Sequence, residues 1–202
     1  MLINSVLLDR EKRVADLAFA LGTYPSANRA TLSGTSQFSD YTNSDPIGVI
    51  SDAIETPLMR PNRMVIGQYA WGVYRRHPKL LQALNMSGSS YGIASRKAVA
   101  ELFELDDIIV GKSYLNSAKK GQTVTQSRVW GKHISLIYQD KTANVQKSGT
   151  FGLTAQFGDR VADVQPDNEK GLHGSHRVTA GESVREVICA NDYAYFLQNV
   201  VA

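Results

Sequence analysis

The stretch AELFELDDIIVG, residues 100–111, changes part-way along from a helical to an extended pattern. Apolar residues recur at helical spacing up to Phe103, so a helix is predicted over residues 95–103. The run Ile108-Ile109-Val110 is short, apolar and β-branched, which predicts a buried strand. A helix that leads directly into a buried strand favours a domain in which helices pack on a sheet.

The segments around this stretch repeat the same alternation. Met64-Val65-Ile66 is a second candidate for a buried strand, and a third strand is predicted over residues 129–138. A polar connection, residues 116–126, lies before that third strand. Helices are predicted by apolar spacing, with Pro46 at a first helical position and a break at His77-Pro78, over residues 46–58, 69–76 and 80–84.

The two ends of the chain differ from the middle. A helix is predicted over residues 3–21, with opposite charges four residues apart at Asp9–Arg13 and Lys12–Asp16. A long irregular loop is expected over residues 22–45. Near the C-terminus we expect a half-buried strand, a link rich in glycine and charge, a second strand and a final apolar segment, at residues 151–157, 163–174, 184–189 and 193–201. The fold class predicted from these patterns is α+β.

Composition excludes several classes of function. The net charge of the 202 residues is +3, which argues against a dedicated nucleic-acid-binding module. Cys189 is the single cysteine, so neither an intramolecular disulfide nor a zinc site of several thiolates is expected. No signal peptide or membrane-spanning run is evident, and we expect a soluble, intracellular protein with no membrane partner.

Motifs that carry chemistry are weak. Gly111-Lys112-Ser113 follows a strand, as in a phosphate-binding loop, but the glycine that this motif needs at position 106 is an aspartate. His173 and His176 lie in the glycine-rich link, where we expect a solvated loop rather than a metal site.

Cys189 lies in an apolar strand and is expected to be buried and inert. Asp106 and Asp107 are adjacent on a strand, so they point to opposite faces and make a poor catalytic pair. His77 is expected to cap carbonyl groups at a helix break, and His133 to lie at a surface or an interface. Trp71, Tyr74 and Trp130 are assigned to the core. We therefore predict no enzyme, no cofactor and no small-molecule substrate; a hydrolase that uses Cys189 or the two-histidine loop is the alternative from another class.

Several blocks together carry more information than any motif. They resemble, in the same order, characteristic stretches of the major capsid proteins of tailed bacteriophages. The blocks span nearly the whole chain, at residues 60–67, 76–81, 100–111, 116–122, 129–133, 181–187 and 195–199.

This resemblance implies the Hong Kong 97-type capsid fold. A peripheral domain would hold a spine helix and long strands, and an axial domain would hold a short mixed sheet flanked by helices. Residues 1–44 would supply the spine helix and its connection, residues 45–145 the axial domain, and residues 146–202 the return to the peripheral domain. Family members carry an N-terminal arm and an extended loop before the spine helix, and we expect both to be lacking because the sequence starts at that helix.

The resemblance also implies a function. The chain would assemble with itself through pentamers and hexamers into an icosahedral shell around phage DNA, after synthesis in the bacterial cytoplasm. The alternative is the shell of an encapsulin-like nanocompartment. Non-specific contact with packaged DNA is expected at most. The candidate residues for contacts between subunits are Arg10, Arg13, Gln37, Asp40, Lys119 and Lys120.

Overall fold

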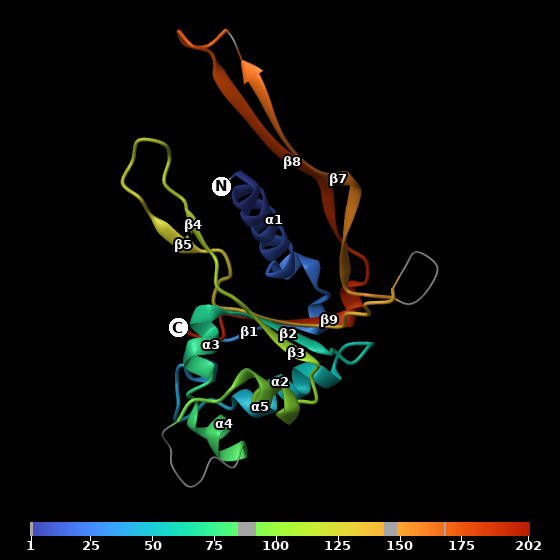
Figure 1. The fold of residues 1–202 in the computed structure, drawn as a ribbon. Coiled ribbons are helices and arrows are strands. Elements are labelled where there is room, and N and C mark those ends of the chain that lie inside the picture. The colour runs from blue at the N-terminus through green and yellow to red at the C-terminus, as the bar shows by residue number, and fades with distance from the viewer. Residues whose placement is uncertain (1, 85–91, 144–148, 168) are drawn as a thin grey trace.

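The computed structural model describes residues 2–84, 92–143, 149–167 and 169–202, and a five-stranded sheet lies at its centre (Figure 1). The β2–β3 and β1–β9 pairs are parallel, whereas β6 is antiparallel to both β2 and β9. The sheet therefore joins segments from the beginning, the middle and the end of the sequence. Its strands follow the order β1 (Arg29–Thr31), β9 (Ala194–Gln198), β6 (Ile134–Ile137), β2 (Arg63–Gly67) and β3 (Asp107–Gly111).

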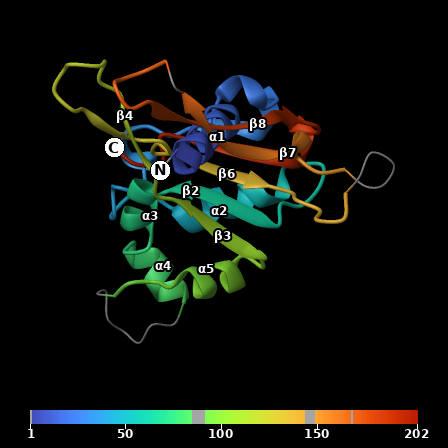
Figure 2. The same ribbon diagram turned by 45° about the horizontal axis from the view of Figure 1, so that its top comes forward.

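Four short helices cover one face of the sheet (Figures 1 and 2). Met64 and Ile66 of β2 point into the core on this side, whereas Val65 packs on the opposite side against Ala15 and Trp130. Burial on both faces explains why β2 reads as a continuous apolar run rather than an alternating one. The four helices are α2 (Pro46–Glu55), α3 (Gln68–Tyr74), α4 (Pro78–Ala83) and α5 (Arg96–Leu102).

Helix α1 (Leu2–Ala18) lies on the opposite side of the sheet (Figure 1). It ends before the predicted Leu21, which belongs to a 3-10 turn, Leu21–Thr23. The side-chain hydroxyls of Thr23 and Tyr24 donate to the carbonyl oxygens of Leu17 and Ala18, at 2.7 and 2.6 Å. These bonds satisfy carbonyl groups that a helix end leaves without partners, and so they place the end of α1.

The segment between α1 and α2 is largely irregular, as expected, but it contributes to both the core and the sheet. Phe38 is fully buried and stacks at a tilt on Tyr74. Two 3-10 turns (Ser26–Asn28 and Gly34–Ser36) flank strand β1. The sequence does not indicate β1, because three residues without an apolar pattern form a strand only through their pairing with β9.

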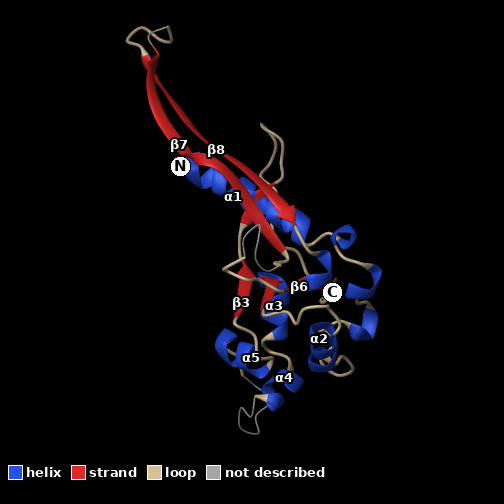
Figure 3. Cartoon of the chain, turned by 90° about the vertical axis from the view of Figure 1, so that its right-hand side faces the viewer, coloured by secondary structure: helices blue, strands red, loops and turns tan. Residues whose placement is uncertain are grey.

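Two hairpins extend from the body (Figures 1 and 3). The smaller consists of β4 (Tyr114–Asn116) and β5 (Gln126–Arg128), which lie at the two ends of the predicted polar connection, residues 116–126. The larger consists of β7 (Gly152–Asp167) and β8 (Ser175–Ile188). Because β7 continues to Asp167, the predicted irregular link over residues 163–174 is wrong at residues 163–167, and β8 begins at Ser175, earlier than the strand predicted over residues 184–189.

The error has a physical cause. The register shifts between Phe157 and Val161, where Gly158 has φ +67°, and this irregularity ends the regular alternation on which the strand was predicted. The strand predicted over residues 129–138 is also too long, since only Ile134–Ile137 pair as β6.

The mixed architecture confirms the predicted α+β class. The domain division stays a prediction. The predicted boundary between residues 145 and 146 lies outside the described residues, and the central sheet takes strands from all three predicted ranges.

Candidate subunit interface

Helix α1 is bonded to the body through one carboxylate. The Oε1 atom of Glu11 accepts a hydrogen bond from the indole Nε1–H of Trp130 at 2.6 Å, and Oε2 accepts from the hydroxyl of Ser113 at 2.6 Å. Trp130 is buried between the helix and the sheet, so its single polar atom needs this partner. Glu11 thus joins the helix to the two segments that follow β3 and precede β6.

The neighbouring basic side chains of α1 bind the large hairpin. Arg13 donates from Nε and Nη2 to the two carboxylate oxygens of Glu186 on β8, at 3.2 and 3.0 Å. The hydrogen bond from Arg13 lowers the pKa of Glu186 below its ordinary value. Arg10 lies one helical turn before Arg13. Glu182 on β8 accepts from Arg10 at 3.5 Å and from Arg160 at 3.0 Å. Arg10 and Arg13 were expected at contacts between subunits, and both have partners within the chain.

The ion pairs predicted along α1 are confirmed. Arg13 also pairs with Asp9, and Lys12 pairs with Asp16. Because Arg13 touches carboxylates of both α1 and β8, the helix and the hairpin share one charged network. The network also reaches the register shift between Phe157 and Val161, because Arg160, which lies inside this shift, bonds to Glu182.

The large hairpin continues beyond the N-terminal end of α1 into solvent (Figures 1 and 3). Not one residue of β7 is buried, and neither is one of β8. Several large apolar side chains are exposed along it and at its tip: Leu153, Phe157, Val161, Val164, Leu172, Val178 and Val187. Exposed apolar side chains gathered on one element indicate a surface for protein contact.

The remaining candidates lie on two other surfaces. Lys119 and Lys120 are exposed in the loop that joins β4 to β5. Gln37 donates from Nε2 to the carbonyl oxygen of Asn199 at 2.9 Å and so fastens the irregular segment to the end of the chain. Asp40 accepts from the side-chain amide of Asn43, which is the main cause of its lowered pKa. The structure therefore divides the six candidates among three places.

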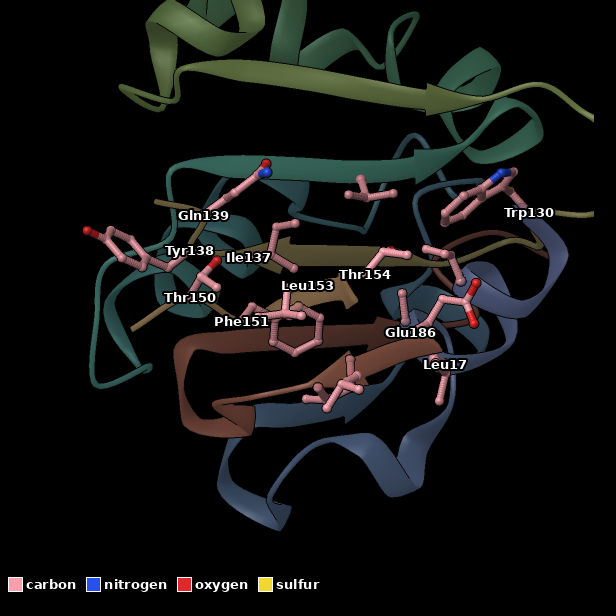
Figure 4. A pocket seen from close by; sticks show the side chains of 16 residues that line it. Leu17, Trp130, Ile137, Tyr138, Gln139, Thr150, Phe151, Leu153, Thr154 and Glu186 are labelled. Atoms are coloured by element: carbon pink, nitrogen blue, oxygen red, sulfur yellow. The ribbon is translucent and has the colours of Figure 1, made fainter. Parts of the chain in front are cut away.

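A cavity of about 270 Å³ lies between α1, the sheet and the base of the large hairpin (Figure 4). Its walls are mainly apolar, and polar groups such as Glu186 and Thr150 stand among them. The hydroxyl of Thr150 is buried without a hydrogen-bond partner among the described residues. The apolar lining includes Val14, Leu17, Val65, Ile137, Phe151 and Leu153.

The Gly-Lys-Ser sequence serves packing rather than phosphate binding. A Cβ atom at Gly111 would lie 2.1 Å from the ring of Trp130, so the indole occupies the space beside this residue. Strand β3 ends at Gly111 and Ser113 bonds Glu11, as a strand that runs into a loop would allow.

Three residues with reactive side chains lie on or next to the large hairpin. No group of three or more metal-ligating side chains gathers in the described ranges. His173 is in the turn at the hairpin tip, and His176 on β8 lies opposite Pro166 on β7. Cys189 was expected to be buried, but it is exposed, because β8 ends at Ile188 and the chain leaves the hairpin there.

His77 differs from its prediction in a different way. It is fully buried, its Nδ1 accepts from the backbone N–H of Lys79, and its Nε2 lies 3.0 Å from the hydroxyl of Ser44. It therefore caps the N-terminus of α4 rather than carbonyl groups. Trp71, Tyr74 and Trp130 are buried, as predicted.

Sequence reasoning missed the carboxylates that hold α1 in place. Glu11 lies within the charged run of residues 9–13, and Glu182 and Glu186 lie in a strand near the C-terminus; none of the three belongs to a recognisable motif. The one available signal was the cluster of Arg10 and Arg13 on a single helical face, which requires acidic partners wherever it is partly covered.

The described part of the chain combines a body in which both sheet faces are covered with a long hairpin braced by a helix. No protein-family model matches the chain. The chain is similar to phage major capsid proteins. It is 43% identical over 199 residues to the major capsid protein of Pseudomonas phage JBD67 and 38% identical over 139 residues to that of Burkholderia phage BcepMu.

These alignments differ in coverage. The first includes 98% of this chain and 64% of the relative, and the second 67% of this chain and 43% of the relative. The chain therefore spans less than two thirds of the length of these curated relatives. Their names support a structural role, and nothing in them favours the nanocompartment alternative.

Two solved structures share the fold. A phage-related protein from Bordetella bronchiseptica matches 98% of this chain and 66% of its own, with a TM-score of 0.80 at 21% identity. A putative capsid protein of an Escherichia coli prophage matches 97% of this chain and 64% of its own, with a TM-score of 0.63 at 16% identity. The expectation of a capsid fold is confirmed. Within the described residues, no helix is long and apolar enough to cross a membrane.

Proposed function

We propose that this chain is the folded body of a phage or prophage shell subunit, which assembles with its own copies through pentamers and hexamers into an icosahedral capsid around DNA. The observation that carries the proposal is the 43% identity with a phage major capsid protein over 98% of the chain. The role is structural and not enzymatic. The protein would be made in the bacterial cytoplasm and would reside in the capsid of the virion.

The assignment of residues to the axial and peripheral domains follows the family resemblance. Residues 45–145 would form the axial domain, around the centres of pentamers and hexamers. Helix α1 and the large hairpin would belong to the peripheral domain, to which residues 1–44 and 146–202 are assigned. The exposed loop with Lys119 and Lys120 supports a contact between neighbouring subunits or a weak, salt-dependent contact with DNA.

Electron microscopy of the purified protein tests the proposal. We expect rings or closed shells with five- and sixfold symmetry as the concentration rises. Because the chain spans 64% of the JBD67 relative, the same test is made on a chimera completed with the remaining residues of that relative. A chain and a chimera that both stay monomeric at every concentration would contradict the proposed function.

Charge reversal tests the candidate residues. Lys119→Glu with Lys120→Glu should lower the yield of shells, since both lysines are exposed in the loop between β4 and β5 and would meet a neighbouring subunit there. Lys97→Glu is the matched control, because Lys97 is an exposed lysine on α5 that pairs only weakly with Glu101 at 3.8 Å. Equal yields from both variants would remove this loop from the interface.

A further inference from the structure

The positive charge of the chain is concentrated in one segment. Residues 108–139 contain five lysine and arginine residues and no aspartate or glutamate, whereas the rest of the chain has 17 basic and 19 acidic residues, a net charge of −2. The segment includes the β4–β5 hairpin, which extends from the body (Figure 1). We call residues 112–132 the basic hairpin. Its five cations are Lys112, Lys119, Lys120, Arg128 and Lys132.

The cations of the basic hairpin are not neutralised within the chain. Among the described residues, not one of the five forms a salt bridge, although all three basic residues of α1 do. The guanidinium carbon of Arg128 lies 4.6 Å from the ring centroid of Tyr114, and Nζ of Lys132 lies 5.3 Å from that of Tyr69. These ring contacts hold two of the charges in place and leave them available to an acidic partner.

A surface of opposite charge lies at the other end of β3. Residues 101–107, which we call the acidic run, contain four exposed carboxylates and no basic residue. Two of the four are already paired with cations, one at 2.9 Å and one weakly at 3.8 Å. Asp106 and Asp107 form no salt bridge with any described residue, and Asp106 accepts only an amide hydrogen bond from Asn62. The four carboxylates are Glu101, Glu104, Asp106 and Asp107.

One chain cannot bring these two surfaces together. Strand β3 separates Asp106 from Lys112, which lie roughly 20 Å apart at the usual rise of an extended strand. A second copy, placed head to tail, brings its acidic run to the basic hairpin of the first. A head-to-tail contact repeats in the same sense from one copy to the next, and it closes into a ring when the rotation allows.

We propose that the basic hairpin of one copy contacts the acidic run of the next copy, and that this contact orders the subunits around a ring. The choice of a second copy as the partner rests on the proposed function and on the matching carboxylates at the far end of β3. Opposite charges across a contact fix its register and exclude wrong partners more than they add affinity.

Charge reversal on each surface tests the contact. The hairpin variant carries Lys119→Glu and Lys120→Glu, and the run variant carries Asp106→Lys and Asp107→Lys. Each should weaken the concentration-dependent association of the purified chain by at least about 10-fold in sedimentation, because like charges would face each other across the contact. Added salt should weaken the association of the wild type as well.

The matched control reverses two charges on the other hairpin. Lys170 and Arg177 are exposed there, and Lys170→Glu with Arg177→Glu changes the net charge as much as the hairpin variant does. We expect the control to associate as the wild type does. A control that is weakened equally would show an effect of net charge alone and would overturn the contact.

Mixing the two variants gives the sharpest test. The reversed hairpin of one variant fits the reversed run of the other, so an equimolar mixture should regain association that neither variant shows alone. The variants must alternate around a ring, so electron microscopy of the mixture should show sixfold rings and no fivefold rings. Regained association also shows that both variants are folded.

The other outcomes overturn the contact. A mixture that associates no better than either variant contradicts it, and so does a wild-type chain that stays monomeric at all concentrations. If the hairpin variant instead loses salt-dependent binding to duplex DNA and mixing restores nothing, the partner of the basic hairpin is nucleic acid and not a second copy.

The contact and the shell function fail separately. Association that mixing restores, in a protein that never forms closed shells, supports the contact and contradicts the shell function. Shells that form in equal yield from the wild type and from both variants support the shell function and contradict the contact.

Discussion

In the body, four of the five residues of β2 are buried. Helices α2 to α5 cover one face of the sheet, and α1 covers the other. In the hairpin, not one of the 16 residues of β7 is buried, and one helix covers one face. A two-stranded ribbon alone is marginally stable in water. The comparison indicates that the body depends on its own packing, whereas the hairpin depends on charged bonds to α1.

Substitution in the body should have the largest effect. A Cβ atom at Gly67 would lie 1.9 Å from the carbonyl oxygen of Gly131, which is backbone and cannot move aside cheaply. Gly67→Ala should therefore lower the free energy of unfolding by about 3 kcal/mol or more. Chemical denaturation measures the change.

Gly72→Ala is the control for this variant. Nothing lies within 4 Å of a Cβ atom at Gly72, and in helix α3 an alanine should be neutral or add up to about 1 kcal/mol. Equal stability of the two variants would contradict the close approach at Gly67.

The next largest effect is expected where the helix meets the body. Glu11→Ala leaves the buried indole N–H of Trp130 and the hydroxyl of Ser113 without their charged acceptor, which should cost about 1–3 kcal/mol. Lys12→Ala removes only an exposed pair with Asp16 and should cost at most about 0.5 kcal/mol. If the two substitutions cost the same, Glu11 does not tie α1 to the sheet.

Acid should weaken the body through His77. Burial lowers the pKa of His77, whereas an unfolded histidine titrates near about 6.5. The unfolded state therefore binds more protons below this pH, and the free energy of unfolding falls as the pH drops through it, by about 1.4 kcal/mol per unit of pKa difference.

Denaturation at pH 7.5 and pH 5.5 measures this loss. The difference between the two pH values should shrink in His77→Gln. Burial also lowers the pKa of His133, so part of the loss should remain in this variant. A variant with the full wild-type difference would show that His77 does not cause it.

The smallest effect on global stability is expected in the hairpin. Glu186→Gln removes the bidentate partner of Arg13 and should cost about 1 kcal/mol or less, since the pair is near the surface. Hydrogen exchange should nevertheless become faster at amides of β7 and β8, while amides of β2 and β6 keep their rates. If hydrogen exchange became equally faster in the body and in the hairpin, the proposed difference between the two regions would be contradicted.

The same contrast explains what the sequence could predict. Met64-Val65-Ile66 was identified as a strand because its continuous apolar run reflects burial on two faces. Residues 108–110 were identified from the same kind of run, although β3 lies at the edge of the sheet and Ile109 is exposed there. The i,i+4 pairs of α1 were identified because they depend on helical spacing alone. Short-range patterns of this kind can be found in any single chain.

The rest depends on partners that are distant in the sequence. Strand β1 exists through β9, and Arg13 finds Glu186 from 173 positions away. The outer half of the hairpin has exposed residues of mixed type after a register shift, so no alternation marks it. Of the candidate site, the basic residues of α1 were found from the sequence, whereas their acidic partners and the cavity could not be.

Three contacts within about one turn of α1 also set the mechanics of the molecule. Glu11 bonds the helix to the segments beside the sheet, and Arg10 and Arg13 bond it to β8. A tilt of the helix would therefore tilt the hairpin about these contacts. From Glu182 to the start of β8 at Ser175 the strand extends seven residues, which corresponds to a lever arm of roughly 23 Å. A tilt of about 5° at the helix would move this end of the strand by roughly 2 Å, so a small change in one carboxylate–guanidinium bond becomes a larger displacement far from the helix.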